Sequence, residues 1–165
     1  MQHDAITTLF RHNVWATLQL IDACAPLTDA QLDSTIIGTF GTIRDTLHHM
    51  GTSERSYFSR IATGKPYRHP ADAPQLTLDE LRESLRASGD GFVQWASRVE
   101  ADETVAVDWD GTPRAVPKTL ILTQAINHAT EHRAQIMAIM TQLGVQPPEL
   151  DGWMYFDAIA PSEEA

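Results

Sequence analysis

Two histidines four residues apart, His128 and His132, carry the clearest chemical signal in the sequence. Side chains at this spacing lie on one face of a helix, and here that face is the apolar side of the helix expected over residues 117–143. Burying an imidazole without partners for its ring nitrogens costs free energy, and one divalent metal ion satisfies both rings. The alternative is two core histidines that are hydrogen-bonded separately. The pair therefore indicates a metal site but does not establish one.

A third ligand is expected from the preceding helical segment around His48 and His49. At about 100° per residue, both side chains lie off the centre of the apolar stripe of that segment, on opposite flanks. His48 shares its flank with Arg44 and Arg55, whose positive charge disfavours a nearby metal, whereas small threonine and serine side chains surround His49. We therefore predict His49 as the third ligand and keep His48 as the alternative. Glu54 is a candidate to hydrogen-bond one of the ligands.

Four long helices must position these residues. Amphipathic spacing, capping residues and glycine or proline punctuation predict helices over residues 4–25, 42–64, 77–99 and 117–143. Two glycines, Gly89 and Gly91, are expected to weaken the middle of the third helix, by roughly 1 kcal/mol each relative to alanine. Four amphipathic helices joined by one long connection predict an all-α four-helix bundle.

Shorter elements are expected outside the bundle. Val105 and Val107 alternate with polar residues before the turn signal Asp110-Gly111, which predicts a short β-hairpin between helices three and four. A short helix is expected within residues 150–159. With no internal repeat or change in composition, residues 1–165 are expected to form a single domain.

Composition excludes some classes of partner. The net charge of −10 and the pI near 5.0 disfavour binding to nucleic acid and to anionic membranes. We expect neither as a partner. The sequence shows no signal peptide and no apolar run long enough to cross a membrane, and its single cysteine, Cys24, cannot form an internal disulfide. A cytoplasmic protein is therefore expected.

Three sequence blocks occur in an order and spacing that match a known family along nearly the whole chain. They are Asn13-Val14-Trp15-Ala16, then Gly41-Thr42-Ile43-Arg44-Asp45-Thr46-Leu47-His48-His49 with Glu54 following, then Asn127-His128-Ala129-Thr130-Glu131-His132-Arg133-Ala134-Gln135. Together they resemble the DinB/YfiT-like family, the damage-inducible family rather than the polymerase that shares the DinB name. The resemblance implies an up-down-down-up helix bundle and a divalent metal on His49, His128 and His132. It also implies a homodimer.

Three histidines leave coordination positions open, as in catalytic rather than structural metal sites. Zinc or nickel is the first expectation, and iron and manganese also suit this ligand set. Since relatives include thiol S-transferases, the resemblance implies a metal-dependent transferase that activates a low-molecular-weight thiol, or water, to act on a small-molecule substrate. Arg133 and Gln135 are candidates to anchor such a thiol. Their alternative roles are helix packing or ion pairing with Glu131 or Asp151.

Two other functions remain open. Residues 128–132 match the His-x-x-Glu-His pattern of inverted zinc peptidases, with Glu131 as general base, but only 33 residues follow His132. This argues against a peptidase and leaves a small-substrate hydrolase open. The third candidate is a metal-binding stress or interaction protein without catalytic activity.

Overall fold

Four long helices make up most of the chain in the computed structural model, which describes residues 4–160. They are α1 (Ala5–Cys24), α3 (Ile43–Thr63), α4 (Leu78–Trp95) and α5 (Lys118–Gln142). The shorter elements are α2 (Asp29–Leu32), η1 (Ala96–Arg98), β1 (Thr104–Trp109), β2 (Thr112–Pro117) and α6 (Gly152–Ile159). The predicted helical bundle, hairpin and terminal helix are all present, and α2 is an addition to the prediction.

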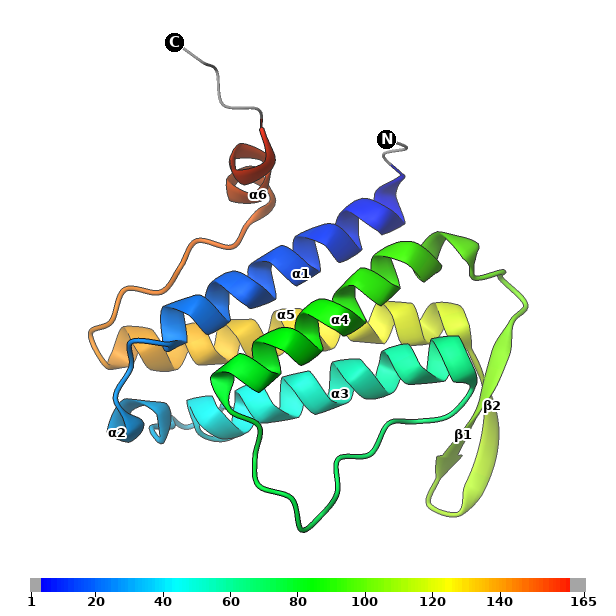
Figure 1. Cartoon of the computed structure of the whole chain (residues 1–165), viewed down its shortest axis with the longest axis horizontal. Helices are drawn as coiled ribbons and strands as arrows, with labels where there is room; N and C mark the ends of the chain where they lie inside the picture. Colours follow the sequence, from blue (N-terminus) through cyan, green and yellow to red (C-terminus); the bar gives the residue numbers. More distant parts are fainter. Residues whose placement is uncertain (1–3, 161–165) are drawn as a thin grey trace.

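The helices follow an up-down-down-up order. α1 and α5 run in one direction along the bundle, and α3 and α4 run in the opposite direction (Figure 1). The connection over residues 64–77 therefore returns along the bundle from the end of α3 to the start of α4, while the β1–β2 hairpin joins α4 to α5 at one end. α3 packs against α4 on one side and α5 on the other. The helices that carry the three predicted ligands are thus antiparallel neighbours.

Local capping explains where these elements begin and turn. α3 begins at Thr42, whose side chain accepts a hydrogen bond from the backbone of Asp45, and it ends at Gly64 with φ of 75°. A complete capping box starts α4. In the hairpin, Asp110 and Gly111 have φ of 54° and 78°, as a type I′ turn requires at both central positions.

The interior of the bundle is apolar at both ends and polar in the middle. One apolar cluster lies toward the α2 end and includes Leu20, Leu47, Leu85 and Ile136. The other lies toward the hairpin and includes Phe10, Ile61, Phe92 and Ile121, with Phe10 stacked on Phe92 at 4.7 Å. Between them along the four helices lie the buried polar side chains Asn13, Thr17, Glu54, Ser88 and Arg133. We call these five residues the polar layer.

Gly89 and Gly91 allow α4 to approach its neighbours closely. A Cβ atom at Gly89 would lie 2.2 Å from Val14 Cγ2 of α1, and one at Gly91 would lie 2.2 Å from Phe58 Cζ of α3. Both distances are far below van der Waals contact. The two glycines lower the helix propensity of α4, as the sequence predicts, but packing against α1 and α3 requires them.

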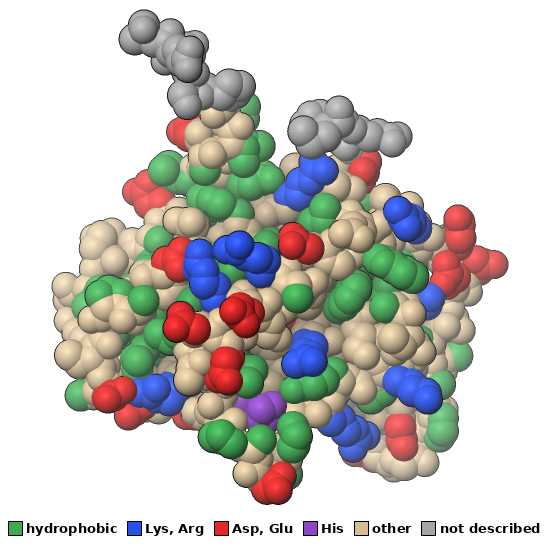
Figure 2. Space-filling view, viewed as in Figure 1, with side chains coloured by type: hydrophobic (Ala, Val, Ile, Leu, Met, Phe, Trp, Pro, Cys, Tyr) green, Lys and Arg blue, Asp and Glu red, His purple; other side chains and the backbone are tan. Residues whose placement is uncertain are grey.

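The last helix, α6, lies outside the bundle against α1. His12 Nε2 donates a hydrogen bond to the carbonyl oxygen of Leu150 at 2.8 Å, and Tyr155 contacts the rings of His12 and Trp15. The rest of α6 is exposed, and hydrophobic side chains gather over it (Figure 2). Within residues 4–160, every helix is too short or too polar to cross a lipid bilayer.

Replacing Gly89 with alanine tests the close packing of α4. Helix propensity alone would make Gly89→Ala more stable by roughly 1 kcal/mol. Because the new methyl group overlaps Val14, we expect a lower free energy of unfolding instead, by about 1–3 kcal/mol in urea titrations. Gly152→Ala in α6 is the control, since its Cβ would meet no atom within 4 Å. A stabilised Gly89→Ala protein would contradict this packing.

Candidate metal centre

Three imidazoles converge between α3 and α5. His49 comes from the second turn of α3, and His128 and His132 come from successive turns of α5. One ring nitrogen from each residue lies within 4.8 Å of the other two, and the Nε2 atoms of His49 and His128 are 2.9 Å apart. With metal–nitrogen bonds of about 2.0–2.1 Å, two ligands of one ion lie no more than about 4 Å apart. Small ring rotations therefore suffice for all three to reach one ion.

Gln135 orients His132. The Nδ1 atom of His132 donates to Gln135 Oε1 at 2.9 Å, and the backbone N–H of Phe40 donates to the same oxygen at 3.1 Å. Two donors on one atom identify it as the amide oxygen. The proton of His132 is therefore on Nδ1, which leaves the lone pair of Nε2 free for a metal. Hydrogen bonds of this kind commonly orient histidine ligands.

Aromatic rings border the cluster. Phe40 stacks on His49 at a centroid distance of 4.2 Å and meets His132 edge-on at 5.3 Å. On the other side, Tyr57 meets His128 edge-on at 5.6 Å. Phe40 is 53% exposed, so it covers the imidazoles while facing solvent itself. The histidines are thus partly or fully buried and bordered by aromatic rings.

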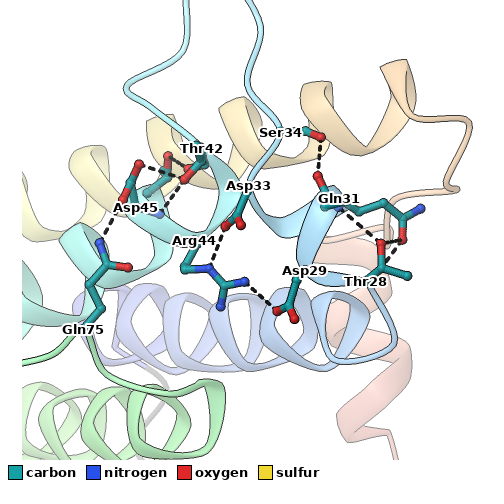
Figure 3. A network of polar contacts seen from close by, with 11 residues as sticks. Thr28, Asp29, Gln31, Asp33, Ser34, Thr42, Arg44, Asp45 and Gln75 are labelled. Atoms are coloured by element: carbon teal, nitrogen blue, oxygen red, sulfur yellow. Dashed lines mark hydrogen bonds and ion pairs between the residues drawn. The ribbon is translucent and has the colours of Figure 1, made fainter.

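The segment that carries Phe40 is anchored at the start of α3 (Figure 3). Arg44 donates hydrogen bonds to Asp33 at 2.7 Å and Asp29 at 2.8 Å, which joins α3 to α2 and its following residue. Asp45 accepts from Thr42 and from Gln75 of the long connection, both at 2.8 Å. These bonds hold both ends, Asp33 and Thr42, of the segment that carries Phe40. They also offset the positive charge of Arg44 near His48.

Burial keeps two of the imidazoles neutral. It lowers the pKa of His49, and positive charge on His132 or His48 would lower it further. Burial, and then His132 and His49, lower the pKa of His128 to about 4. A neutral imidazole is the form that binds metals, so these histidines are available as ligands at neutral pH.

His48 lies apart from the cluster. Its Nδ1 accepts a hydrogen bond from the backbone N–H of Leu76 at 3.2 Å, and its ring packs edge-on against His69 at 4.9 Å. His69 belongs to the 64–77 connection and is half-buried rather than a solvated loop residue. The structure therefore brings His49 to His128 and His132, and directs His48 toward the connection.

Glu54 has a different role from the one expected. It is buried in the polar layer, where Ser88 donates to its Oε1 at 3.0 Å and Asn13 donates to its Oε2 at 3.3 Å. It makes no hydrogen bond to a histidine of the cluster, and Gln135 instead holds His132. Gln135 lies three residues after His132, one helical turn away, so the sequence contained a signal for this contact.

Arg133 packs inside the bundle, which is one of the alternatives to thiol anchoring. Its guanidinium donates to Asn13 Oδ1 at 2.6 Å, Thr17 Oγ1 at 2.9 Å and Thr130 Oγ1 at 3.1 Å. The other alternative, an ion pair with Glu131 or Asp151, does not form, because the side chain points into the bundle and is 5% exposed. It is therefore a packing residue of the polar layer and is not available to anchor a thiol.

Two other candidate groups lie outside the cluster. Glu131 is exposed on α5 and is not among the residues that could share a metal with the histidines. Cys24 is buried in the apolar core, and burial raises the pKa of its thiol to about 12. Neither is placed to act as a base or nucleophile at the three histidines. Phe40, which lies in a loop without periodic pattern, was not among the expected site residues.

Comparison with known proteins agrees with this arrangement. A family model described as the DinB family matches residues 1–163. The chain belongs to the DinB family. A solved structure of a DinB-like protein from Bacillus cereus ATCC 10987 superposes with a TM-score of 0.60 at 22% sequence identity, covering 86% of this chain and 92% of the other. That likeness shows the shared fold. Curated proteins gave no match.

The polar layer makes stability depend on pH. Burial raises the pKa of Glu54 from 4.5 to about 7, although Ser88, Arg133 and Asn13 act in the opposite direction. A carboxyl group with a raised folded-state pKa gives full stability below pH 4.5, and that contribution is lost as the pH rises through about 7. Glu54→Gln mimics the protonated group. As the pH rises from 4.5 to about 7, we expect the parent to lose stability that the variant keeps. The difference in unfolding free energy, variant minus parent, should therefore increase by roughly 3 kcal/mol at most.

Chemical unfolding of both proteins at several pH values measures this difference. Exposed Glu83→Gln is the control for the loss of one carboxyl group. A difference between Glu54→Gln and the parent that stays constant with pH would show that Glu54 titrates alike in the folded and unfolded chains.

Proposed function

We propose that this DinB-family chain is a metal-dependent enzyme in which His49, His128 and His132 hold one divalent ion. The observation that carries the proposal is the convergence of three imidazole nitrogens within 4.8 Å, with no carboxylate or thiol of the described residues in the group. A set of three protein ligands is typical of catalytic sites, because it leaves positions for a substrate. All-nitrogen ligation suits zinc or nickel, and also iron or manganese.

The proposed reaction is transfer of a low-molecular-weight thiol to a small electrophile. When bound, the ion supplies a Lewis acid that lowers the pKa of a thiol or of water. The chain supplies the geometry: Gln135 fixes the tautomer of His132, while Phe40 and Tyr57 shield the imidazoles from bulk solvent. A reaction that uses free thiols suits a reducing compartment, so we place the protein in the cytoplasm.

Two other functions compete with thiol transfer. A small-substrate hydrolase would use the same three ligands, but Glu131, the base expected for it, is exposed and outside the cluster, and no carboxylate of residues 4–160 is grouped with the histidines. This favours the thiol, which needs no such base once its pKa is lowered. A non-catalytic metal-binding protein would share the site and lack turnover. Assay of the metal-loaded protein with a panel of thiols and an electrophile distinguishes these functions.

The assay has three informative outcomes. Thiol-dependent turnover that is lost in His128→Ala supports the proposed transferase. Hydrolysis of small esters or amides without a thiol favours the hydrolase. Tight metal binding with neither activity favours the non-catalytic alternative.

Metal content tests the site directly. We expect about one divalent ion per chain by elemental mass spectrometry of the untagged protein, and loss of this ion in His49→Ala, His128→Ala and His132→Ala. His48→Ala is the matched control, because His48 bonds to Leu76 outside the cluster. Removing the orienting amide in Gln135→Leu should weaken metal binding by about 10–100-fold. Metal retained in His49→Ala but lost in His48→Ala would reverse our choice of the third ligand.

We also propose that the chain forms a homodimer through α6. Trp153, Phe156 and Ile159 are 80%, 61% and 57% exposed, which is unusual for three apolar residues of one short helix. A buried aromatic side chain covers about 150–250 Å². Two copies of this face therefore approach the ~1,000 Å² of a specific interface.

Self-association through α6 can be measured by light scattering after size-exclusion chromatography. We expect a dimer for the parent and a monomer for Trp153→Asp combined with Phe156→Asp, because charged side chains oppose burial of this face. Leu120→Asp, an exposed leucine at the start of α5, is the control and should remain dimeric. A parent protein that is monomeric at high concentration would contradict the proposal.

A further inference from the structure

A pocket of about 420 Å³ lies beside the histidine cluster, between α3, α5 and the hairpin. Tyr57 lies between the pocket and the histidine cluster, because it lines the pocket and its ring meets His128 edge-on at 5.6 Å. The pocket is also lined by Arg60 of α3 and Gln124 of α5, which lie nearer the hairpin end of these helices than the histidines do. A molecule bound to an ion at the histidines therefore has a path for its remaining atoms into this pocket.

Two opposite charges line the pocket without neutralising each other. Arg60 is half-buried in the last turn of α3, and Asp108 is exposed on β1. Among residues 4–160, neither side chain forms a hydrogen bond or an ion pair, including with the other. By contrast, Arg44, Arg82 and Lys118 are all paired with carboxylates. The pocket thus presents one free cation and one free anion to a ligand.

The remaining lining gives the pocket an apolar floor with one amide. Val107 and Val116 of the hairpin and Ile121 of α5 are buried, and Gln124 adds a donor and an acceptor at the rim. An apolar pocket with a few polar groups at defined positions is typical of small-molecule sites. The volume also lies in the usual range for such sites, about 300–1,000 Å³.

The distance from the histidines to Arg60 limits the size of the ligand. Tyr57 follows His49 by eight residues, which corresponds to about 12 Å along a helix. Three residues of extended peptide span about 10 Å. Arg60 lies eleven residues after His49, about 16 Å along the helix, so a ligand that reaches from the histidines to the Arg60 side chain has the size of a small peptide.

We propose that this pocket binds the α-amino-acid head group of a peptide-sized substrate whose other end reaches the metal at His49, His128 and His132. Arg60 would pair with the carboxylate of the head group, Asp108 with its ammonium group, and Gln124 with either. The inference rests on the proposed metal function for the role of the far end. It assigns Arg60 and Asp108 as determinants of substrate specificity.

The charges favour an amino-acid head over other ligands. Asp108 and the net charge of −10 oppose a ligand with several negative charges, and Arg60 opposes a simple amine. A group with carboxylate and ammonium on one carbon satisfies both side chains at once. Guanidinium and carboxylate also match in geometry, since two parallel hydrogen bonds can form between them.

Binding to the metal-free protein tests the pocket separately from the metal. The probe is γ-glutamylglycine, which has an amino-acid head and no thiol. Its matched analogues are glutarylglycine, which lacks the ammonium group, and γ-aminobutyrylglycine, which lacks the head carboxylate. In two-dimensional NMR titrations we expect γ-glutamylglycine to shift the side-chain signals of Arg60 and Gln124, and each analogue to bind about tenfold more weakly.

Variants complete the experiment. The Arg60→Gln variant should bind γ-glutamylglycine about tenfold more weakly than the parent and should no longer prefer it over γ-aminobutyrylglycine. The Asp108→Asn variant should no longer prefer γ-glutamylglycine over glutarylglycine. Exposed Arg86→Gln on α4 is the control and should bind as the parent does. A role of Arg60 in stability alone would change the unfolding free energy without changing these preferences.

The outcomes separate the two proposals. Absence of binding, or equal binding of all three compounds to the parent, overturns the inference. Because no metal is used, failure of the chain to bind metal would refute the proposed function without altering this result. Preference for γ-glutamylglycine that depends on Arg60 supports the pocket in either case.

Discussion

The burial of the Arg133 guanidinium constrains the rest of the bundle. A charged group inside a protein requires hydrogen-bond partners, and Arg133 finds them on α1, where Asn13 and Thr17 accept its protons. Asn13 in turn donates to Glu54 on α3, which accepts from Ser88 on α4. One connected set of contacts therefore reaches all four long helices. A change in the rotation or register of any one of them leaves a buried polar group without a partner.

This constraint also determines where the histidines point. His132 directly precedes Arg133, so turning Arg133 into the bundle directs His132 toward the neighbouring surface formed with α3. His128 follows on the same face one turn away, and His49 meets both from the antiparallel helix. The polar layer thus supports the candidate site without a hydrogen bond to any of the three imidazoles. The structural role of Arg133 and the proposed ligand role of His132 thus fall on adjacent residues of α5.

Much of this arrangement could be predicted from local patterns. Apolar spacing and capping residues identify the four long helices, and Asp110-Gly111 identifies the hairpin turn. Contacts between distant segments could not be predicted in this way. The pairing of Glu54 with Asn13 and Ser88 depends on how three helices pack, and Phe40 reaches His49 from an irregular loop. The need for glycine at position 89 could not be predicted either, because it arises from the side chain of Val14 on another helix.

The polar layer has a consequence for synthesis of the chain. Asn13, Glu54 and Ser88 leave the ribosome before Arg133, which is 120 residues from its partner Asn13. Domains generally fold as units as the chain emerges. Until α5 is made, the first three helices lack the Arg133 guanidinium that completes their buried contacts. In a nascent chain that ends before α5, we therefore expect water to hydrate Asn13, Glu54 and Ser88. The fold is thereby coupled to completion of the helix that carries two of the three histidines.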